Sequence, residues 1–156
     1  MKTLSLFAVA VGLVVGSSAG VAAPRGDEKP AKDDIKKLEG DWKVTTWQQA
    51  GAELPGEALE TVKWSVKGDK YTFEMGGEME DGTIKVDPAK KPATINLEIT
   101  SGNDKGKSQV GIYKVDGEAI TFCFARPGAT ERPKEFTSNA DNGHILLTVR
   151  RAKKDD

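Results

Sequence analysis

The sequence of 156 residues has one cysteine, one histidine and no clear excess of either charge. A single thiol excludes a disulfide framework within the chain and any site built from several cysteines. A single histidine excludes the common metal sites that use two or three histidines. The formal net charge of −1 excludes a generally basic nucleic-acid-binding surface, because phosphate neutralisation takes a surplus of lysine and arginine. We therefore expect no nucleic-acid partner, no metal ion and no cofactor.

No apolar run long enough to span a membrane follows residue 23. Before it, Met1-Lys2 supplies a positive start, an apolar run extends over residues 4–15, and small residues fill 16–23. This order is typical of a secretory signal peptide, and its apolar run is short for a membrane span. We expect residues 1–23 to direct export to the periplasm, cell envelope or exterior, with cleavage after Ala23, one residue earlier, or after Ala19. An uncleaved anchor is the alternative.

Apolar side chains are almost missing from residues 24–34, which predicts a charged flexible linker. A short helical turn is expected at 33–39, with Ile35 and Leu38 on its apolar side. The remaining chain, 35–153, is long enough for one domain and short for two.

The dominant pattern from Trp42 onward is alternation of apolar and polar residues with period two, which is typical of strands. Turn pairs such as Asp116-Gly117 and Asn142-Gly143 separate the runs. Eight or nine strands are expected, at about 42–49, 61–67, 70–75, 80–86, 93–100, 107–115, 118–125, 134–138 and 144–151. Consecutive hairpins must bury one face and protect two edges, and closure achieves both. The predicted fold is an all-β, antiparallel up-and-down barrel of about eight strands with a short N-terminal helical turn.

Gly40-Asp41-Trp42 opens the first expected strand, and Arg150-Arg151 lies on the last. This arrangement resembles the lipocalin and wider calycin pattern, in which a tryptophan closes one end of the barrel and an arginine from the final strand packs across it. The resemblance implies that Trp42 and Arg150 are structural residues that close the barrel.

Further motifs resemble an uncharacterised lipocalin-like domain family that is abundant among exported planctomycete proteins. These motifs are Leu38-x-Gly40-x-Trp42, Asp81-Gly82-Thr83, Asp87-Pro88-x-Lys90-Lys91-Pro92, Gly106-Lys107, Gly111-Ile112-Tyr113, Phe122-Cys123-Phe124-Ala125 and Arg132-Pro133-x-x-Phe136. They cover residues 35–153. The resemblance implies a barrel and export, and it implies no activity.

Aromatic residues make up 6% of the chain, and most lie in the expected strands. The aromatics available to line a cavity are Trp47, Trp64, Tyr71, Phe73, Tyr113, Phe122 and Phe124. An eight-stranded barrel is either filled by side chains or just wide enough for one small ligand, and the sequence leaves both alternatives open.

Alternation along the expected strands assigns ligand-binding side chains to the lumen, although a register error of one residue would exchange inside and outside. The assigned residues are Trp64, Phe73, Leu97, Ile112, Phe122 and Phe124. Arg132, in a loop bounded by prolines, is assigned to the rim, where it would pair with an anionic group of a ligand. The alternative is that this arginine binds backbone carbonyls.

A catalytic interpretation would rest on Cys123 and His144. Cys123 lies between two phenylalanines of a strand, which favours a packed wall thiol over an activated nucleophile. His144 begins the last strand, and alternation does not direct it toward Cys123. Because the sequence carries no nucleophile motif, no catalytic residue is assigned and no enzymatic activity is expected.

Four acidic residues gather around a glycine-rich turn, namely Glu74, Glu78, Glu80 and Asp81. Their spacing lacks the EF-hand pattern, which favours a solvated hairpin tip over a calcium site.

The expected function is non-catalytic binding of a small apolar or amphipathic molecule in the barrel mouth of an exported protein. A first alternative is a filled barrel that acts as a protein-interaction or cell-envelope module, which predicts an exposed apolar patch and no cavity. A second is a hydrolase-type enzyme at the barrel mouth, which requires Cys123 or His144 in a water-accessible pocket beside an acid. The sequence predicts neither the oligomeric state nor the identity of a ligand.

Overall fold

The computed structural model of the protein describes residues 28–153, so the predicted signal peptide at 1–23 lies outside the described residues. Within this range, neither helix is long and apolar enough to cross a membrane. The helices are α1 (Glu28–Leu38) and α2 (Gly56–Leu59). The strands are β1 (Gly40–Gln49), β2 (Ala52–Glu53), β3 (Lys63–Lys67), β4 (Lys70–Met75), β5 (Glu78–Asp87), β6 (Ala93–Ile99), β7 (Ser108–Asp116), β8 (Ala119–Phe124) and β9 (Ile145–Arg151).

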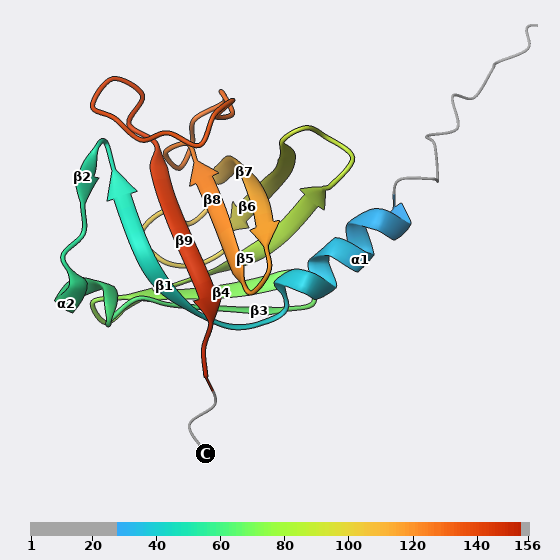
Figure 1. Ribbon diagram of the computed structural model, residues 1–156, viewed down its shortest axis with the longest axis horizontal. Helices are drawn as coiled ribbons and strands as arrows, with labels where there is room; N and C mark the ends of the chain where they lie inside the picture. The colour runs from blue at the N-terminus through green and yellow to red at the C-terminus, as the bar shows by residue number, and fades with distance from the viewer. Residues whose placement is uncertain (1–27, 154–156) are drawn as a thin grey trace, which may run out of the picture.

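The strands form one antiparallel sheet in which each long strand pairs with the next long strand along the chain. Pairing of β1 with β9 closes this sheet into a barrel (Figure 1). The two residues of β2 extend the sheet beside the end of β1. The other eight strands make a closed up-and-down barrel with a helix before it, which confirms the predicted fold class.

The prediction of a strand at 134–138 is wrong, because these residues lie in the long loop 125–144 between β8 and β9. Phe136 belongs to this loop, and the Lys114 ammonium lies over its ring, 4.9 Å from the ring centroid. β8 and β9 already pair with each other and with their outer neighbours, so the closed barrel has no edge left for another strand.

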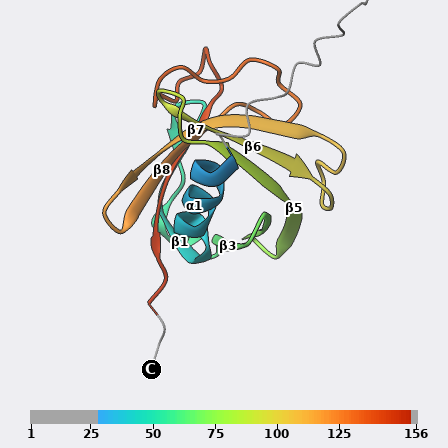
Figure 2. The same ribbon diagram turned by 90° about the vertical axis from the view of Figure 1, so that its right-hand side faces the viewer.

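The helix before the barrel is longer than the turn expected at 33–39. It begins at Glu28, so residues 28–34, which the charged composition assigned to a flexible linker, are helical. Ala31, Ile35 and Leu38 follow the spacing of one helical face and pack against the barrel core. Figure 2 shows α1 lying across one end of the barrel, and the Tyr113 hydroxyl of β7 donates a hydrogen bond of 2.6 Å to Asp34 of the helix.

Trp42 is buried at this same end, and its Nε1 donates to the carbonyl of Leu38 at 2.7 Å. The arginine that packs across it is Arg151, with its guanidinium carbon 4.6 Å from the ring centroid. Arg151 is paired directly with Trp42 in the β1–β9 register, whereas Arg150 pairs with Lys43. The residue that packs across Trp42 is therefore Arg151 and not the predicted Arg150, and Trp42 itself belongs to the buried core.

The Arg151→Ala variant should lower the free energy of unfolding by about 1–2 kcal/mol. It loses the cation–π contact with Trp42 and the hydrogen bonds that Arg151 donates to the carbonyls of Glu39 and Lys37. Urea denaturation measures the change. Arg150→Ala removes a neighbouring exposed arginine and is the matched control, with an expected change below about 0.5 kcal/mol. Equal effects of the two variants would contradict this assignment.

Candidate ligand-binding site

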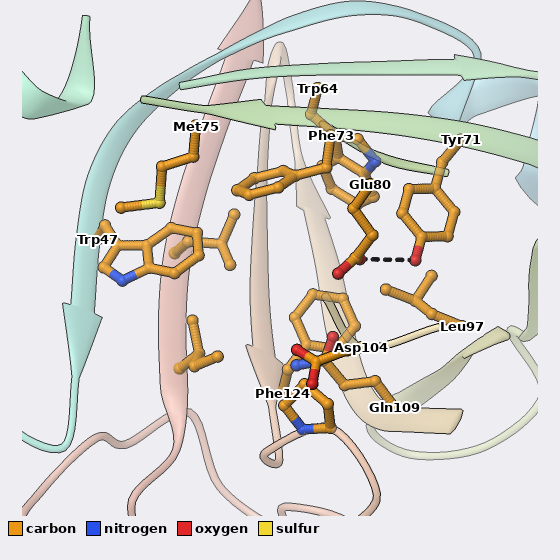
Figure 3. Close-up of a pocket in the computed structure, with 13 residues that line it drawn as sticks. Trp47, Trp64, Tyr71, Phe73, Met75, Glu80, Leu97, Asp104, Gln109 and Phe124 are labelled. Carbon is orange, nitrogen blue, oxygen red and sulfur yellow. Dashed lines mark hydrogen bonds between the residues drawn. The ribbon is translucent and has the colours of Figure 1, made fainter. Parts of the chain in front are cut away.

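The interior of the barrel is packed at the α1 end and hollow at the other. Near α1, the inward side chains of the strands fill the space, as with Val66, Ile84 and Val149, each at most 4% exposed. Toward the opposite end, 13 residues line a cavity of about 220 Å³ (Figure 3). They are Trp47, Trp64, Tyr71, Phe73, Met75, Glu80, Leu97, Asp104, Gln109, Phe124, Pro127, Ile145 and Leu147.

One wall of the cavity is a row of side chains on three neighbouring strands. Trp64 of β3 pairs with Phe73 of β4, which pairs with Glu80 of β5. Trp64 is 4% exposed and packs edge-on against Phe122, with ring centroids 4.6 Å apart. Its Nε1 is buried without a hydrogen-bond partner among the described residues. The row thus holds an unsatisfied donor and a carboxylate on the same wall.

Glu80 points into the cavity between Phe73 and Tyr71 (Figure 3). It accepts a hydrogen bond of 2.8 Å from the Tyr71 hydroxyl. Burial raises the pKa of Glu80, and the nearby Asp104 carboxylate adds to this rise, while the hydrogen bond from Tyr71 opposes it. Burial also raises the pKa of Tyr71, as does its bond to Glu80, so the phenol keeps its proton and remains the donor.

Gly82 makes room for the ring that supports Glu80. It pairs with Tyr71 across β4 and β5, and a Cβ atom at this position would lie 2.5 Å from Cε1 of Tyr71. The same Cβ would lie even closer to the backbone carbonyl oxygen of Glu98 on β6, so any other residue would disturb the β5–β6 pairing as well as the Tyr71 ring.

The mouth of the cavity carries a second acid. Asp104, in the loop between β6 and β7, lines the cavity and accepts a hydrogen bond of 2.7 Å from Lys107. Gln109 is 7% exposed, and its Nε2 donates to the carbonyl of Ala125 at 2.8 Å. On the opposite side, the half-buried rings of Trp47 and Phe73 pack with centroids 5.8 Å apart.

Four of the six residues assigned to the lumen line the cavity: Trp64, Phe73, Leu97 and Phe124. Phe122 faces inward but lies deeper, fully buried, with its ring stacked 5.6 Å from Phe124. It belongs to the packed core and not to the cavity wall.

Ile112 was assigned to the wrong face. Its neighbours Gly111 and Tyr113 face the interior, where the Phe124 ring covers Gly111, so Ile112 lies on the outer face of β7. It is nevertheless only 1% exposed. The loop 125–144 covers this outer face. A position buried under a loop carries an apolar residue just as a position in the lumen does, so the sequence pattern cannot tell the two apart.

Arg132 belongs to that covering loop and is not a residue of the cavity rim. Its Nη1 donates to the carbonyls of Ile95 and Gly111, at 3.0 and 2.7 Å, and its Nη2 donates to Oδ1 of Asn96 at 2.6 Å. The rim assignment is therefore wrong, and the alternative in which this arginine binds backbone carbonyls is correct. The three bonds anchor the loop on the outside of β6 and β7.

Cys123 and His144 lie outside the lumen as well. The Cys123 thiol is fully buried on the outer face of β8 and donates a bond of 3.5 Å to the carbonyl of Thr137. Burial raises its pKa, which keeps the thiol protonated. His144 lines a separate surface hollow with Arg126, Glu131 and Asn142.

Alternation did not assign several of the lining residues to the lumen, and Trp47, one of the aromatics available to line a cavity, shows one reason. The register of β1 against β9 shifts between Val44 and Thr46. Strict alternation from the inward-facing Trp42 and Val44 would direct residue 47 outward, but the bulge turns Trp47 inward. The inward direction of Glu80 could have been predicted, because alternation along β5 places it on the same face as the inward-facing Gly82, Ile84 and Val86.

The Glu80→Gln variant should be more stable than the natural protein near pH 7.5 and equally stable near pH 3.5. A raised pKa means that the folded state binds the Glu80 proton more tightly than the unfolded state does. Stability is therefore lost as pH rises through the pKa of the folded state, and glutamine removes this loss. Urea denaturation at both pH values measures the difference. The exposed Glu98 on β6 supplies the control, since Glu98→Gln changes charge equally without altering the cavity, and an equal gain in both variants would contradict the prediction.

Comparison of the chain with family models, curated proteins and solved structures finds no match. The assignment of a function therefore rests on the geometry and chemistry of the cavity. Its distinguishing features are the aromatic wall, the inward carboxylate of Glu80 and the unpaired Nε1 of Trp64.

Proposed function

We propose that this protein binds a small apolar or amphipathic molecule in the open end of its barrel, without catalysis. The observation that carries the proposal is the cavity of about 220 Å³ among aromatic and aliphatic side chains. Apolar cavities of about 150 Å³ already bind benzene. A small hydrophobic compound therefore fits here, and its apolar surface would cover the half-buried rings of Trp47 and Phe73.

The filled-barrel alternative predicts no cavity and an apolar patch on the outside. Among the described residues, the large apolar side chains that stand exposed are Met79 and Val115, at 58% and 43%. They lie on β5 and β7, near opposite ends of the barrel, and form no common patch. The hollow interior and this outer surface both favour a binding protein over an interaction module.

Titration with the neutral fluorescent probe N-phenyl-1-naphthylamine tests the proposal. The natural protein should bind the probe with a rise in emission. Met75→Trp should weaken binding by about tenfold or more, because Met75 lines the cavity and a larger side chain there occupies the space.

Met79 supplies the matched control for this titration. It lies one strand away on the outside of the barrel, so Met79→Trp introduces the same side chain without entering the cavity. Its probe affinity should stay within about twofold of the natural protein. Absence of probe binding to the natural protein, or equal loss in both variants with unchanged thermal unfolding, would overturn the proposal.

We also propose that the chain is exported, on the strength of the charged start, the apolar run and the small residues of 1–23. The intact mass of the protein recovered from its own source should correspond to a chain that starts at Pro24, Ala23 or Gly20. Leu13→Arg interrupts the apolar run and should leave the full 156 residues inside the cell. Recovery of the uncleaved natural chain from the cytoplasm would contradict this proposal.

A further inference from the structure

The polar groups of the cavity are distributed unevenly. Among the described residues that line it, the charged side chains are Glu80 and Asp104, and none is a lysine, arginine or histidine. Lys107 pairs with Asp104 from outside the lining, at 2.7 Å. Glu80 has the neutral Tyr71 hydroxyl as its partner, so within residues 28–153 no cation balances its negative charge. An uncompensated carboxylate in such a partly buried place favours a positively charged guest.

The aromatic wall strengthens the same preference. The faces of aromatic rings carry negative electrostatic potential, and an ammonium group near a ring is attracted to it. Phe73 and Tyr71 lie on β4, the strand next to Glu80, and Trp64 lies on β3, directly beyond Phe73 in the sheet register. A cation bound at Glu80 would therefore meet ring surface as well as a carboxylate.

Trp64 adds an independent observation that points to a ligand. Its side chain is 4% exposed, and its Nε1 is buried without a partner in the part of the chain that the structure describes. Figure 3 shows the indole nitrogen on the side of the cavity where Glu80 lies. A buried N–H group without an acceptor costs free energy, and an oxygen atom of a ligand would remove that cost.

We propose that the ligand of this cavity is a small amphipathic amine whose protonated nitrogen pairs with Glu80 and whose neighbouring oxygen accepts a hydrogen bond from Nε1 of Trp64. This inference rests on the proposed binding function and specifies its ligand class. The apolar part of the amine lies against Trp47, Phe73 and Leu97. Tyr71 holds the Glu80 carboxylate in place, and Asp104 adds negative potential at the mouth.

Calorimetry with three matched probes tests the charge preference: 1-naphthylmethylamine, 1-naphthalenemethanol and 1-naphthoate. They share one ring system and are a cation, a neutral molecule and an anion near pH 7.5. The amine should bind about tenfold more tightly than the alcohol, and the naphthoate more weakly than both. Glu80→Gln should reduce the preference for the amine over the alcohol to about twofold or less.

Glu98→Gln is the matched control, because it removes one carboxylate from the outside of β6. It should retain the preference for the amine, whereas equal loss in both variants would show that net charge alone is responsible and would overturn the inference. The inference also fails if the alcohol or the naphthoate binds best. In that case the proposed function, binding of a small apolar or amphipathic molecule, still holds, because one of these molecules binds. If none of the three binds, the inference fails, and the N-phenyl-1-naphthylamine titration decides whether the proposed function fails with it.

The role of Trp64 has a readout of its own. The amino alcohol 2-amino-1-(1-naphthyl)ethanol places an oxygen beside the amine, and it should bind more tightly than 2-(1-naphthyl)ethylamine. In ¹H–¹⁵N spectra it should also shift the indole resonance of Trp64. The Trp42 indole is the internal control, since its N–H already bonds to Leu38 and should not move. A shift at Trp42 alone, or no gain from the hydroxyl, would overturn the part of the inference that concerns Trp64.

Discussion

Antiparallel pairing between β1 and β9 is the constraint on which the rest of the structure depends. It joins the two ends of the meander, so that each of the eight long strands has two partners and none remains an open edge. Closure also gives the inward face a shared interior, in which alternate residues from every strand can pack. The same pairing brings Arg151 onto Trp42 and so fastens the helix end of the barrel to its final strand.

The interior that closure creates has two unlike parts. Toward α1, branched aliphatic and aromatic side chains fill it, and the helix covers the end. Toward the loops, the rings of Trp47 and Phe73 are only half-buried, and the cavity holds a carboxylate, that of Glu80, whose ionisation is made unfavourable by burial. A barrel built for stability alone would place an apolar residue at position 80 and a partner beside Nε1 of Trp64. Departures of this kind from good packing are characteristic of binding sites, where local stability is lower so that a ligand can complete the contacts.

The sequence predicted the strands well because period-two alternation and Asp-Gly or Asn-Gly turns are local signals, and the meander follows from them. It predicted the facing of Trp64, Phe73, Leu97 and Phe124 for the same reason. The errors arise where a distant part of the chain decides. Ile112 is buried from outside by the loop 125–144, Trp47 is turned inward by a bulge in β1, and Arg151 rather than Arg150 reaches Trp42 because of the β1–β9 register. Residues 134–138 alternate weakly but find no free edge to pair with.

Part of the cavity lining, including Glu80 and Trp64, comes from one short stretch of the chain. Trp64, Tyr71, Phe73, Met75 and Glu80 all belong to β3, β4 and the start of β5, whereas closure depends on β1, β9 and α1 at the other side of the meander. The closing strands also contribute Trp47, Ile145 and Leu147 to the lining, but Glu80 and Trp64 lie outside them. A relative of this protein could exchange the residues of this one pair of hairpins and alter the polar contacts of the cavity while retaining the strands that close the barrel.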